Sequence, residues 1–455
     1  MASPRTEPAD IAPKATGRLL IRDVSLVSPA GVVERNQHIA IDGTAIAAVG
    51  EEPEGFQPDE ILDGRELLAV PAFFNAHCHA AMTLTRGWAE DLPFDRWLNE
   101  RIWVAESALT EDDVYWGASL AACEMIRSGT VGFADHYFYM DRVAQVVAQS
   151  GMKALLAWCW FGLGPDKEVG GISFATTEQF VESWQGDAEG RIRTCFGPHS
   201  PYMCSPQALK QVHEAAERLG AGVHLHLSES GEQVQQSLKE HGRTPVGHVA
   251  ALGLFAVPAL AAHCNCVTDD DLEILARNRV AVAHAPKTYM KLAMDMPPVE
   301  RLLAHDVRVA LATDGPASNA DLNLLEVMRL TGLVQKGLQA KAEALPIAQL
   351  MRMASRNGAY ALGFASSGKI APGAAADITL FDTRGTHWRP RHDLAASVVY
   401  SSHPADVRHV LCDGRFLLRD GRITLLDEER ILYEAEKRAF RMVGAPMERV
   451  RSYPS

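Results

Sequence analysis

Histidine and acidic residues gather where short apolar runs of the sequence end. They occur in Asn75–His79, with histidines at 77 and 79, in His224–Glu229, with histidines at 224 and 226, and at His263, His284 and Asp314. Imidazole nitrogens and a carboxylate oxygen form a borderline-soft donor set that suits Zn(II) and also accepts Fe(II) or Mn(II). We therefore predict a site for one divalent metal ion with a position left open for water, which is typical of catalysis.

The spacing of these histidines restricts which of them can share one ion. Alternate side chains of an extended segment point to the same side, so His77 and His79 can chelate together while Cys78 points away. One imidazole from the later pair and the Asp314 carboxylate would complete the set. His224 and His226 have the same parity, so spacing alone does not choose between them.

Eight apolar runs, most of them followed by a helical pattern, must position these residues. The runs are Val70–Asn75, Thr130–Ala134, Lys153–Trp158, Ile192–Gly197, Gly222–Leu227, Leu260–Cys264, Val280–His284 and Val309–Thr313. Eight such units over roughly 300 residues indicate an α/β fold, a (β/α)8 barrel of the TIM type, whose active sites lie at the carboxyl ends of the strands. A doubly wound open sheet would be expected to carry a Gly-rich phosphate turn, which the sequence lacks.

Short β-type runs flank the barrel on both sides and predict a small β-sandwich domain built from both chain ends. The predicted division is a mobile tail over residues 1–17, sandwich strands over 18–69, the hydrolase barrel over 70–365, further sandwich strands over 366–427, and a surface helix with a tail over 428–455.

Composition and charge exclude several classes of protein. The chain has 455 residues, of which 47% are hydrophobic, and its 44 basic against 57 acidic residues give a formal charge of −13. Such a field repels phosphate backbones and anionic lipids, so neither nucleic acid nor a membrane surface is an expected partner. Because the sequence shows no signal-peptide core and its eight cysteines follow no disulfide framework, we expect a cytoplasmic protein with reduced thiols.

Several motifs resemble those of the amidohydrolase superfamily, specifically its aromatic-amine deaminase branch of 5-methylthioadenosine/S-adenosylhomocysteine deaminases and triazine hydrolases. The resemblance extends from about Leu19 to about Leu425. The motifs are Phe74–His79, Met82–Gly87, Glu90–Leu92, Trp97-Leu98, Gly197–Tyr202, His226 with Glu229, Ala262–Cys264 and Thr313–Asn319.

The resemblance implies a role for each residue of the predicted site. It implies that His77, His79, His226 and Asp314 hold one metal ion, usually zinc, which selects His226 over His224. No lysine stands at the end of the fourth strand, so a mononuclear site is expected. Glu229 would then protonate the ring nitrogen beside the attacked carbon, His263 would orient the attacking water, and Asp314 would accept the proton of that water.

The resemblance also implies substrate contacts by Trp97, by Glu106 on ribose hydroxyls, by His199 and by Ser318, in addition to Glu229. Two departures from the family pattern affect recognition. No arginine occurs near Ala157-Trp158 or near Gly171-Ile172, where the branch binds the homocysteine carboxylate. The family commonly has Pro-x-Ser-Asn after the seventh strand, whereas this chain reads Pro286-Lys287-Thr288-Tyr289, and we expect the bulky Tyr289 to reshape the pocket wall.

These expectations point to a metal-dependent hydrolytic deaminase of an amino-substituted heteroaromatic ring. A nucleoside such as 5-methylthioadenosine or adenosine is the expected substrate, and Trp158 and Trp160 would add an apolar subsite. The alternatives are a triazine-type hydrolase or a guanine, 8-oxoguanine or pterin deaminase, and, from another class, a non-catalytic scaffold that keeps only the barrel. The presence of every expected ligand and proton-transfer residue disfavours the scaffold, and the resemblance implies a homo-oligomer.

Overall fold

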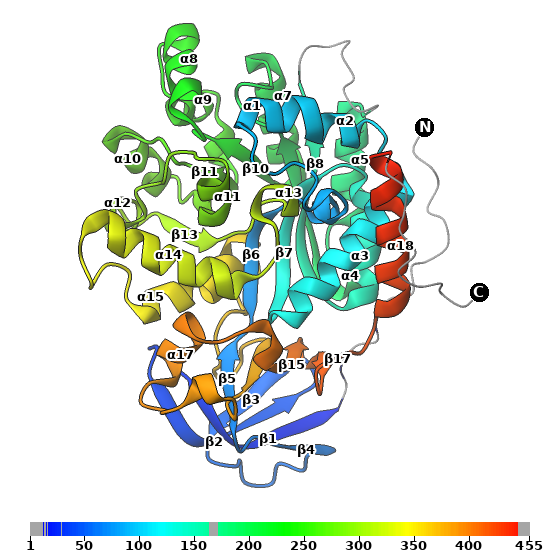
Figure 1. Cartoon of the computed structure of the whole chain (residues 1–455), viewed down its shortest axis with the longest axis vertical. Coiled ribbons are helices and arrows are strands. Elements are labelled where there is room, and N and C mark those ends of the chain that lie inside the picture. The colour runs from blue at the N-terminus through cyan, green and yellow to red at the C-terminus, as the bar shows by residue number, and fades with distance from the viewer. Residues whose placement is uncertain (1–11, 13–14, 16, 29, 163–171, 445–455) are drawn as a thin grey trace.

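The computed structural model describes residues 12, 15, 17–28, 30–162 and 172–444, which form a large barrel above a smaller β-sheet domain (Figure 1). Most of the tails predicted at the two ends lie outside these residues. Ala12 is described and buried, and its N–H donates to the carbonyl of Ala148 at 3.0 Å. None of the helices that the described residues form is long and apolar enough to cross a membrane.

Eight parallel strands form the barrel, as predicted. In sequence order they are β6 (Phe73–Cys78), β7 (Thr130–Tyr137), β8 (Lys153–Trp160), β9 (Ile192–Pro198), β10 (Gly222–Leu227), β11 (Ala259–His263), β12 (Ala281–His284) and β13 (Arg308–Leu311). The first and the last strand meet at a seam, where the N–H groups of Thr313 and Asp314 donate to the carbonyl of His77 at 3.3 and 3.0 Å. These bonds bring two segments that are far apart in the sequence together at one end of the barrel.

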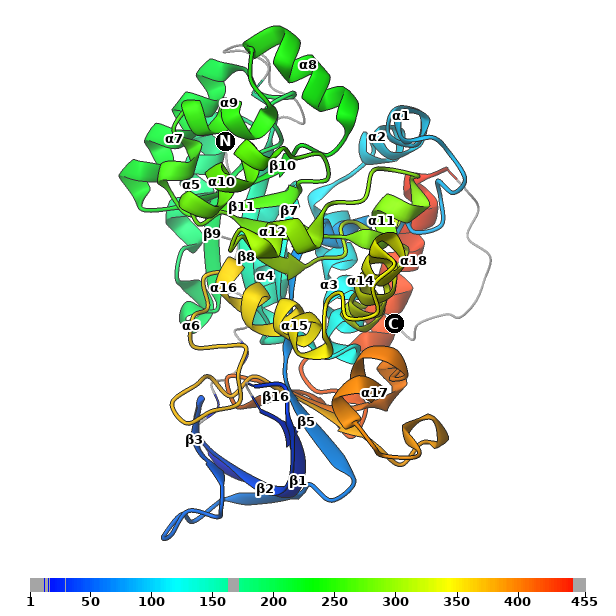
Figure 2. The same ribbon diagram turned by 90° about the vertical axis from the view of Figure 1, so that its left-hand side faces the viewer.

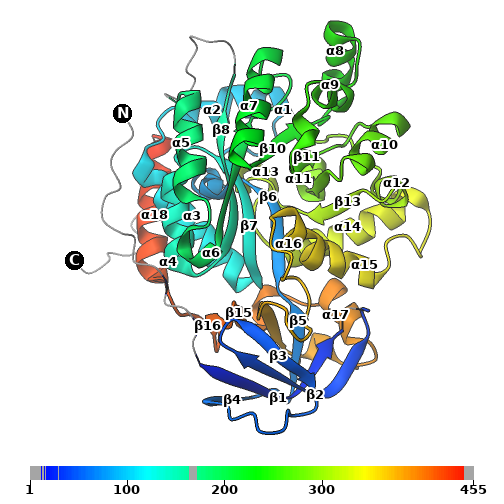
Figure 3. The same ribbon diagram turned by 180° about the vertical axis from the view of Figure 1, so that it is seen from behind.

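Helices surround the barrel and cover the outer face of its strands (Figure 3), and side chains inside the barrel bury the inner face. They are α3 (Glu111–Arg127), α4 (Met140–Ser150), α5 (Phe174–Trp184), α6 (Asp187–Gly190), α7 (Pro206–Leu219), α8 (Gly231–His241), α9 (Pro245–Ala251), α10 (Asp269–Arg277), α11 (Pro286–Lys291), α12 (Val299–Ala304), α13 (Pro316–Asn319), α14 (Leu324–Gln339), α15 (Ile347–Arg352) and α16 (Gly358–Ala361). Local sequence sets several of their starts. The first turn of α3, for example, is closed by a capping box between Thr110 and Asp113.

The long connection after β6 covers the end of the barrel that lies opposite the small domain (Figure 1). It contains the short helices η1 (Ala80–Thr85), α1 (Phe94–Arg96) and α2 (Trp103–Glu106), with a π-helical turn, η2 (Trp97–Ile102), between the last two. This connection therefore supplies side chains above the carboxyl ends of the strands.

The small domain is one mixed sheet of nine strands drawn from both chain ends. Its order is β17 (Arg422–Ile423), β16 (Arg415–Arg419), β15 (Val407–Cys412), β14 (Ile378–Asp382), β5 (Leu67–Pro71), β1 (Arg18–Val27), β2 (Val33–Asp42) and β3 (Ala45–Gly50), with β4 (Glu60–Asp63) paired to β1. The sheet curls on itself (Figure 2), and it encloses an apolar core that includes Ile21, Ile39 and Leu380. The two layers of the predicted sandwich are thus parts of one continuous sheet.

Buried ion pairs join the barrel to the small domain, and the C-terminal helix packs on the outside of the barrel. Lys153, at the start of β8, donates to Asp377 and to Asp413 of the small domain, each at 2.7 Å. The predicted C-terminal helix forms as α18 (Glu428–Met442) and lies beside α3 (Figure 1), where Ala435 packs near Leu84. α17 (Leu394–Tyr400) packs against α14 and α15.

Candidate metal centre and active site

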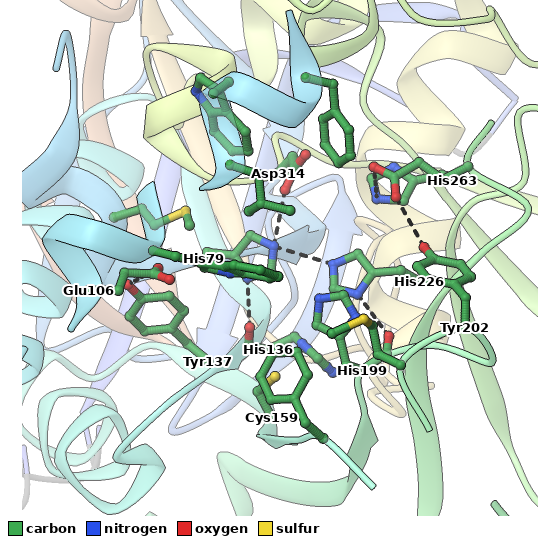
Figure 4. A pocket seen from close by; sticks show the side chains of 18 of the residues that line it. His79, Glu106, His136, Tyr137, Cys159, His199, Tyr202, His226, His263 and Asp314 are labelled. Carbon is green, nitrogen blue, oxygen red and sulfur yellow. Dashed lines mark hydrogen bonds and ion pairs between the residues drawn. The ribbon is translucent and has the colours of Figure 1, made fainter. Parts of the chain in front are cut away.

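Three histidines and one aspartate converge at the carboxyl ends of the strands, and Figure 4 shows three of the four, His79, His226 and Asp314. His77 lies near the end of β6 and His79 directly follows that strand, His226 belongs to β10, and Asp314 follows β13. The Nε2 atoms of His79 and His226 are 3.4 Å apart, and Asp314 Oδ1 lies 3.1 Å from Nε2 of His79 and 3.5 Å from Nε2 of His77. The barrel thus gathers donors from its first, fifth and eighth strands.

The opposite ring nitrogen of each histidine has a partner that aims its Nε2 at the centre. Nδ1 of His79 lies 2.6 Å from the carbonyl of His136, and Nδ1 of His226 lies 2.9 Å from the carbonyl of His199. Because a carbonyl can only accept, both Nδ1 atoms carry the ring proton, which leaves the Nε2 lone pairs free to bind a metal.

His77 differs from the other two because its Nδ1 partner is a side chain. Nδ1 of His77 lies 2.9 Å from Nε2 of His224, which is fully buried. The structure thus separates the two histidines that the sequence left equivalent. His226 faces the centre, and His224 holds His77 from behind.

Asp314 is anchored so that both of its oxygens stay near the centre. The N–H of Gly315 donates to Oδ1 at 2.8 Å, and the hydroxyl of Ser318 donates to Oδ2 at 3.3 Å. Burial alone would raise the pKa of Asp314, but its interactions with His77 and His79 outweigh burial and hold that pKa well below its usual range. Asp314 is therefore a carboxylate. Burial also lowers the pKa of His77 to about 4, which keeps that imidazole neutral.

These four side chains fit a divalent ion. Zinc–ligand bonds of about 2.0–2.2 Å put neighbouring ligand atoms about 2.9–3.6 Å apart, depending on whether four or five ligands surround the ion. Three separations among these donor atoms, 3.1, 3.4 and 3.5 Å, fall in that range, and the three histidine nitrogens all lie within 4.8 Å of one another. Nε2 of His77 is also buried without a hydrogen-bond partner, which is an unfavourable state that a metal ligand bond would relieve.

Glu229 and His263 lie beside this centre. Oε2 of Glu229 accepts from the hydroxyl of Tyr202 at 3.0 Å and from the side-chain amide of Gln233 at 3.4 Å. Oε1 lies 3.7 Å from Nε2 of His263, so it is the oxygen that faces the reaction centre. His263 has a φ of 78°, a left-handed conformation that is costly for a residue with a side chain and recurs at functional sites.

A pocket opens above these groups, and its wall is largely apolar. The apolar lining comprises Met82, Phe94, Trp97, Leu98, Trp103, Phe138, Phe161, Met203 and Leu292. Trp97, on η2, is only 6% exposed and stacks on Phe94, with their ring centres 6.0 Å apart. Such a wall suits a flat aromatic ligand.

Glu106 and His199 provide polar groups on the same pocket. The hydroxyl of Tyr137 donates to Oε1 of Glu106 at 2.5 Å. Burial nevertheless raises the pKa of Glu106 to about 7, outweighing the opposing effect of Tyr137. The ring of His199 stacks between those of Phe161 and His226, at centre distances of 4.8 and 4.5 Å.

The model of the amidohydrolase family matches residues 68–417 of the chain. The chain belongs to this family. A 5-methylthioadenosine/S-adenosylhomocysteine deaminase of Pelotomaculum thermopropionicum is 44% identical to this amidohydrolase over 92% of the chain and 97% of the relative. A protein of the same name from Dictyoglomus thermophilum is 43% identical over 94% and 99%.

Solved structures agree with the architecture of this amidohydrolase. An adenosine deaminase from Xanthomonas campestris with bound zinc is 30% identical, with a TM-score of 0.89 over 95% of this chain and 100% of that one. An atrazine chlorohydrolase from Arthrobacter aurescens complexed with zinc shares the fold at 22% identity, with a TM-score of 0.85 over 92% and 100%. The predicted (β/α)8 barrel of an amidohydrolase is therefore confirmed.

The structure of this amidohydrolase places four predicted substrate residues on the pocket and two elsewhere. Trp97, Glu106, His199 and Glu229 are among the lining residues. Ser318 and Tyr289 are not among the lining residues; they are buried, with Ser318 bonded to Asp314 and Tyr289 beside His263, and their contact with substrate stays a prediction.

Other side chains were missed or misplaced by sequence reasoning. Trp158 and Trp160 do not line the pocket, because both pack against phenylalanines of α5 on the outside of β8. Tyr202 and Tyr137, which hold the two pocket glutamates, were not singled out. Tyr202 ends the Gly197–Tyr202 motif, and that position is the one signal that could have found it.

Proposed function

We propose that this protein is a zinc-dependent deaminase that hydrolyses the exocyclic amine of an adenine-type nucleoside, such as 5-methylthioadenosine or adenosine, and releases ammonia. One observation carries the proposal. A metal-type donor set, a carboxylate directed at the reaction centre and a second carboxylate, Glu106, all lie on one largely apolar pocket. The names of the relatives, which match nearly the whole chain, support the same substrate class.

The reaction needs a nucleophile and an acid at neutral pH. When bound by His77, His79, His226 and Asp314, a divalent ion would supply the nucleophile by lowering the pKa of water to about 7. Attack on the ring carbon breaks aromaticity, so a proton must reach the adjacent ring nitrogen as the tetrahedral centre forms. Oε1 of Glu229 can deliver it, because Tyr202 and Gln233 hold the other oxygen.

Asp314 and His263 would act on the attacking water, Asp314 by accepting its proton and His263 by orienting it. The Asp314 carboxylate accepts a proton from the attacking water, and it can then pass that proton to the amine that leaves as ammonia. Nε2 of His263 lies on the same side as Oε1 of Glu229 and can orient the water. Water and the aminated ring are consumed, and the oxo ring and ammonia are formed, so no further reactant is needed.

The remainder of the pocket would bind the nucleoside. Trp97 and the neighbouring aromatic side chains would pack on the base, and Glu106 would accept hydrogen bonds from the ribose hydroxyls. Tyr137 orients the Glu106 carboxylate for that task through its 2.5 Å hydrogen bond.

The test is ammonia release by metal-analysed protein with 5-methylthioadenosine, S-adenosylhomocysteine, adenosine, guanine, 8-oxoguanine, isoxanthopterin, melamine and a chlorotriazine. We expect turnover of 5-methylthioadenosine or adenosine, lost on chelation and restored by zinc. Glu106→Gln should raise KM for nucleosides about 10-fold or more, because a charged hydrogen-bond acceptor is lost. Turnover of free bases or triazines alone, or a Glu106→Gln variant that matches the parent on every substrate, would refute ribose binding.

We further propose, from the family resemblance, that the enzyme is a cytoplasmic homo-oligomer. Light scattering of the purified zinc-loaded protein gives its mass directly. A monomer of 49.6 kDa at micromolar concentration would contradict the oligomer.

A further inference from the structure

Tyr289 lies behind His263, on the side away from the pocket. It belongs to α11, and its side chain is fully buried. Its hydroxyl oxygen accepts from the N–H of Ala285 at 3.0 Å and lies 3.4 Å from Nδ1 of His263. The two rings meet edge to face, with centres 5.7 Å apart. The family commonly has asparagine at this position, where this chain has the tyrosine.

The hydrogen atoms at this contact can be assigned. Because Ala285 donates to the Tyr289 oxygen, the hydroxyl hydrogen must find an acceptor of its own. The neighbouring His284 does not serve, since both of its buried ring nitrogens lack a hydrogen-bond partner. Among the described residues, the acceptor within hydrogen-bonding distance of the Tyr289 hydroxyl is Nδ1 of His263. The reverse arrangement would leave a buried hydroxyl hydrogen without a partner, which is costly.

We propose that Tyr289 is a positioning residue that fixes the tautomer of His263, with Nδ1 as acceptor and the ring proton on Nε2. Nε2 is the nitrogen that faces the reaction centre and lies 3.7 Å from Oε1 of Glu229. His263 then acts there as a hydrogen-bond donor toward the attacking oxygen or Glu229. It cannot also accept the proton of the water, so that task falls to Asp314. This division of roles rests on the proposed function, whereas the tautomer itself does not.

The first measurement is the nitrogen NMR spectrum of the zinc-loaded protein labelled with ¹⁵N-histidine, compared with that of His263→Asn to identify the His263 signals. We expect a protonated Nε2 and an unprotonated Nδ1. A protonated Nδ1 in the parent protein would overturn the proposal. Because this experiment needs no substrate and no Tyr289 variant, it decides the tautomer even if the substrate panel shows no turnover.

The second measurement is the kinetics of Tyr289→Phe on the substrate that the panel identifies. We expect kcat to fall about 10-fold while KM stays within about twofold and zinc content is unchanged, because outer partners of catalytic groups act on the reaction rather than on binding. Tyr115→Phe is the matched control, since it removes a part-buried hydroxyl that bonds Gln149 at 2.7 Å, and Tyr115 is not a lining residue of the pocket. A Tyr289→Phe variant with the parent's kcat would overturn the proposal.

Discussion

Replacing Glu106 by glutamine should stabilise the protein at alkaline pH. Burial raises the pKa of Glu106 from its ordinary value of 4.5 to about 7, so the folded state holds this proton more tightly than the unfolded chain does. Below about pH 4.5 the carboxyl is protonated in both states and costs nothing. Between about pH 4.5 and 7 the unfolded chain ionises this carboxyl while the folded state does not, so stability falls over that range and the full loss is reached above pH 7. Glutamine is neutral throughout and avoids that loss.

The shift of the Glu106 pKa sets the size of the effect. At about 1.4 kcal/mol per pKa unit, the full penalty above pH 7 is about 3 kcal/mol. Because Glu106 is only partly buried and pocket water screens its charge, we expect about 2 kcal/mol. For a cooperative unit of this size, that corresponds to about 2–3 °C in Tm.

The assay compares the Tm of Glu106→Gln and the parent protein at pH 5 and pH 8.5, at one fixed zinc concentration. The variant should melt higher at pH 8.5, and the difference should shrink toward pH 5. Glu217→Gln, at an exposed position on α7, is the control for the loss of a glutamate charge. A Tm difference that is the same at both pH values, or a variant that melts lower at pH 8.5, would refute the reasoning. The residue that we expect to bind ribose would then carry no stability cost.

Three further predictions concern the metal, the acid and the substrate. His224→Leu should weaken zinc binding about 10- to 100-fold in chelator competition, because Nδ1 of His77 loses its partner. His224→Asn should recover part of the lost affinity. Unchanged zinc affinity in His224→Leu would exclude a role for His224. Tyr202→Phe should lower kcat about 10-fold, because Oε2 of Glu229 loses its shortest hydrogen bond. A kcat equal to that of the parent would mean that Gln233 alone is enough to hold the Glu229 carboxylate. The described pocket lining contains no lysine or arginine to bind the homocysteine carboxylate. The kcat/KM for S-adenosylhomocysteine should therefore be at least about 10-fold below that for 5-methylthioadenosine, and equal values would contradict this expectation.

The strand ends that carry His77, His79 and Asp314 were predictable because two simple regularities combine there. Side chains alternate along a strand, and all eight strands of the barrel end on the same side. Parity alone could not decide whether His224 or His226 is the ligand. The answer depends on which imidazole faces the centre and which lies behind His77, and only the three-dimensional structure shows this.

Residues outside the strand ends were harder to place. Alternation puts Trp158 and Trp160 on the same face of β8, but it does not say whether that face is the pocket or the helix layer. Tyr289 lies on a short helix, where small differences in the start of the helix rotate a side chain from the pocket to its back. Its bulk was evident from the sequence, but its direction was not.

The seam between β6 and β13 has a consequence for how the protein is made. His77 and Asp314 lie more than two hundred residues apart in the chain, yet backbone bonds join them directly. Such a distant pairing has a high loop-closure cost and is expected late in folding. On the ribosome the first two histidines emerge long before Asp314 is synthesised, so the four-residue site cannot assemble on the growing chain until the eighth strand has left the exit tunnel. A nascent chain that stops short of Asp314 would lack both the seam and the complete donor set.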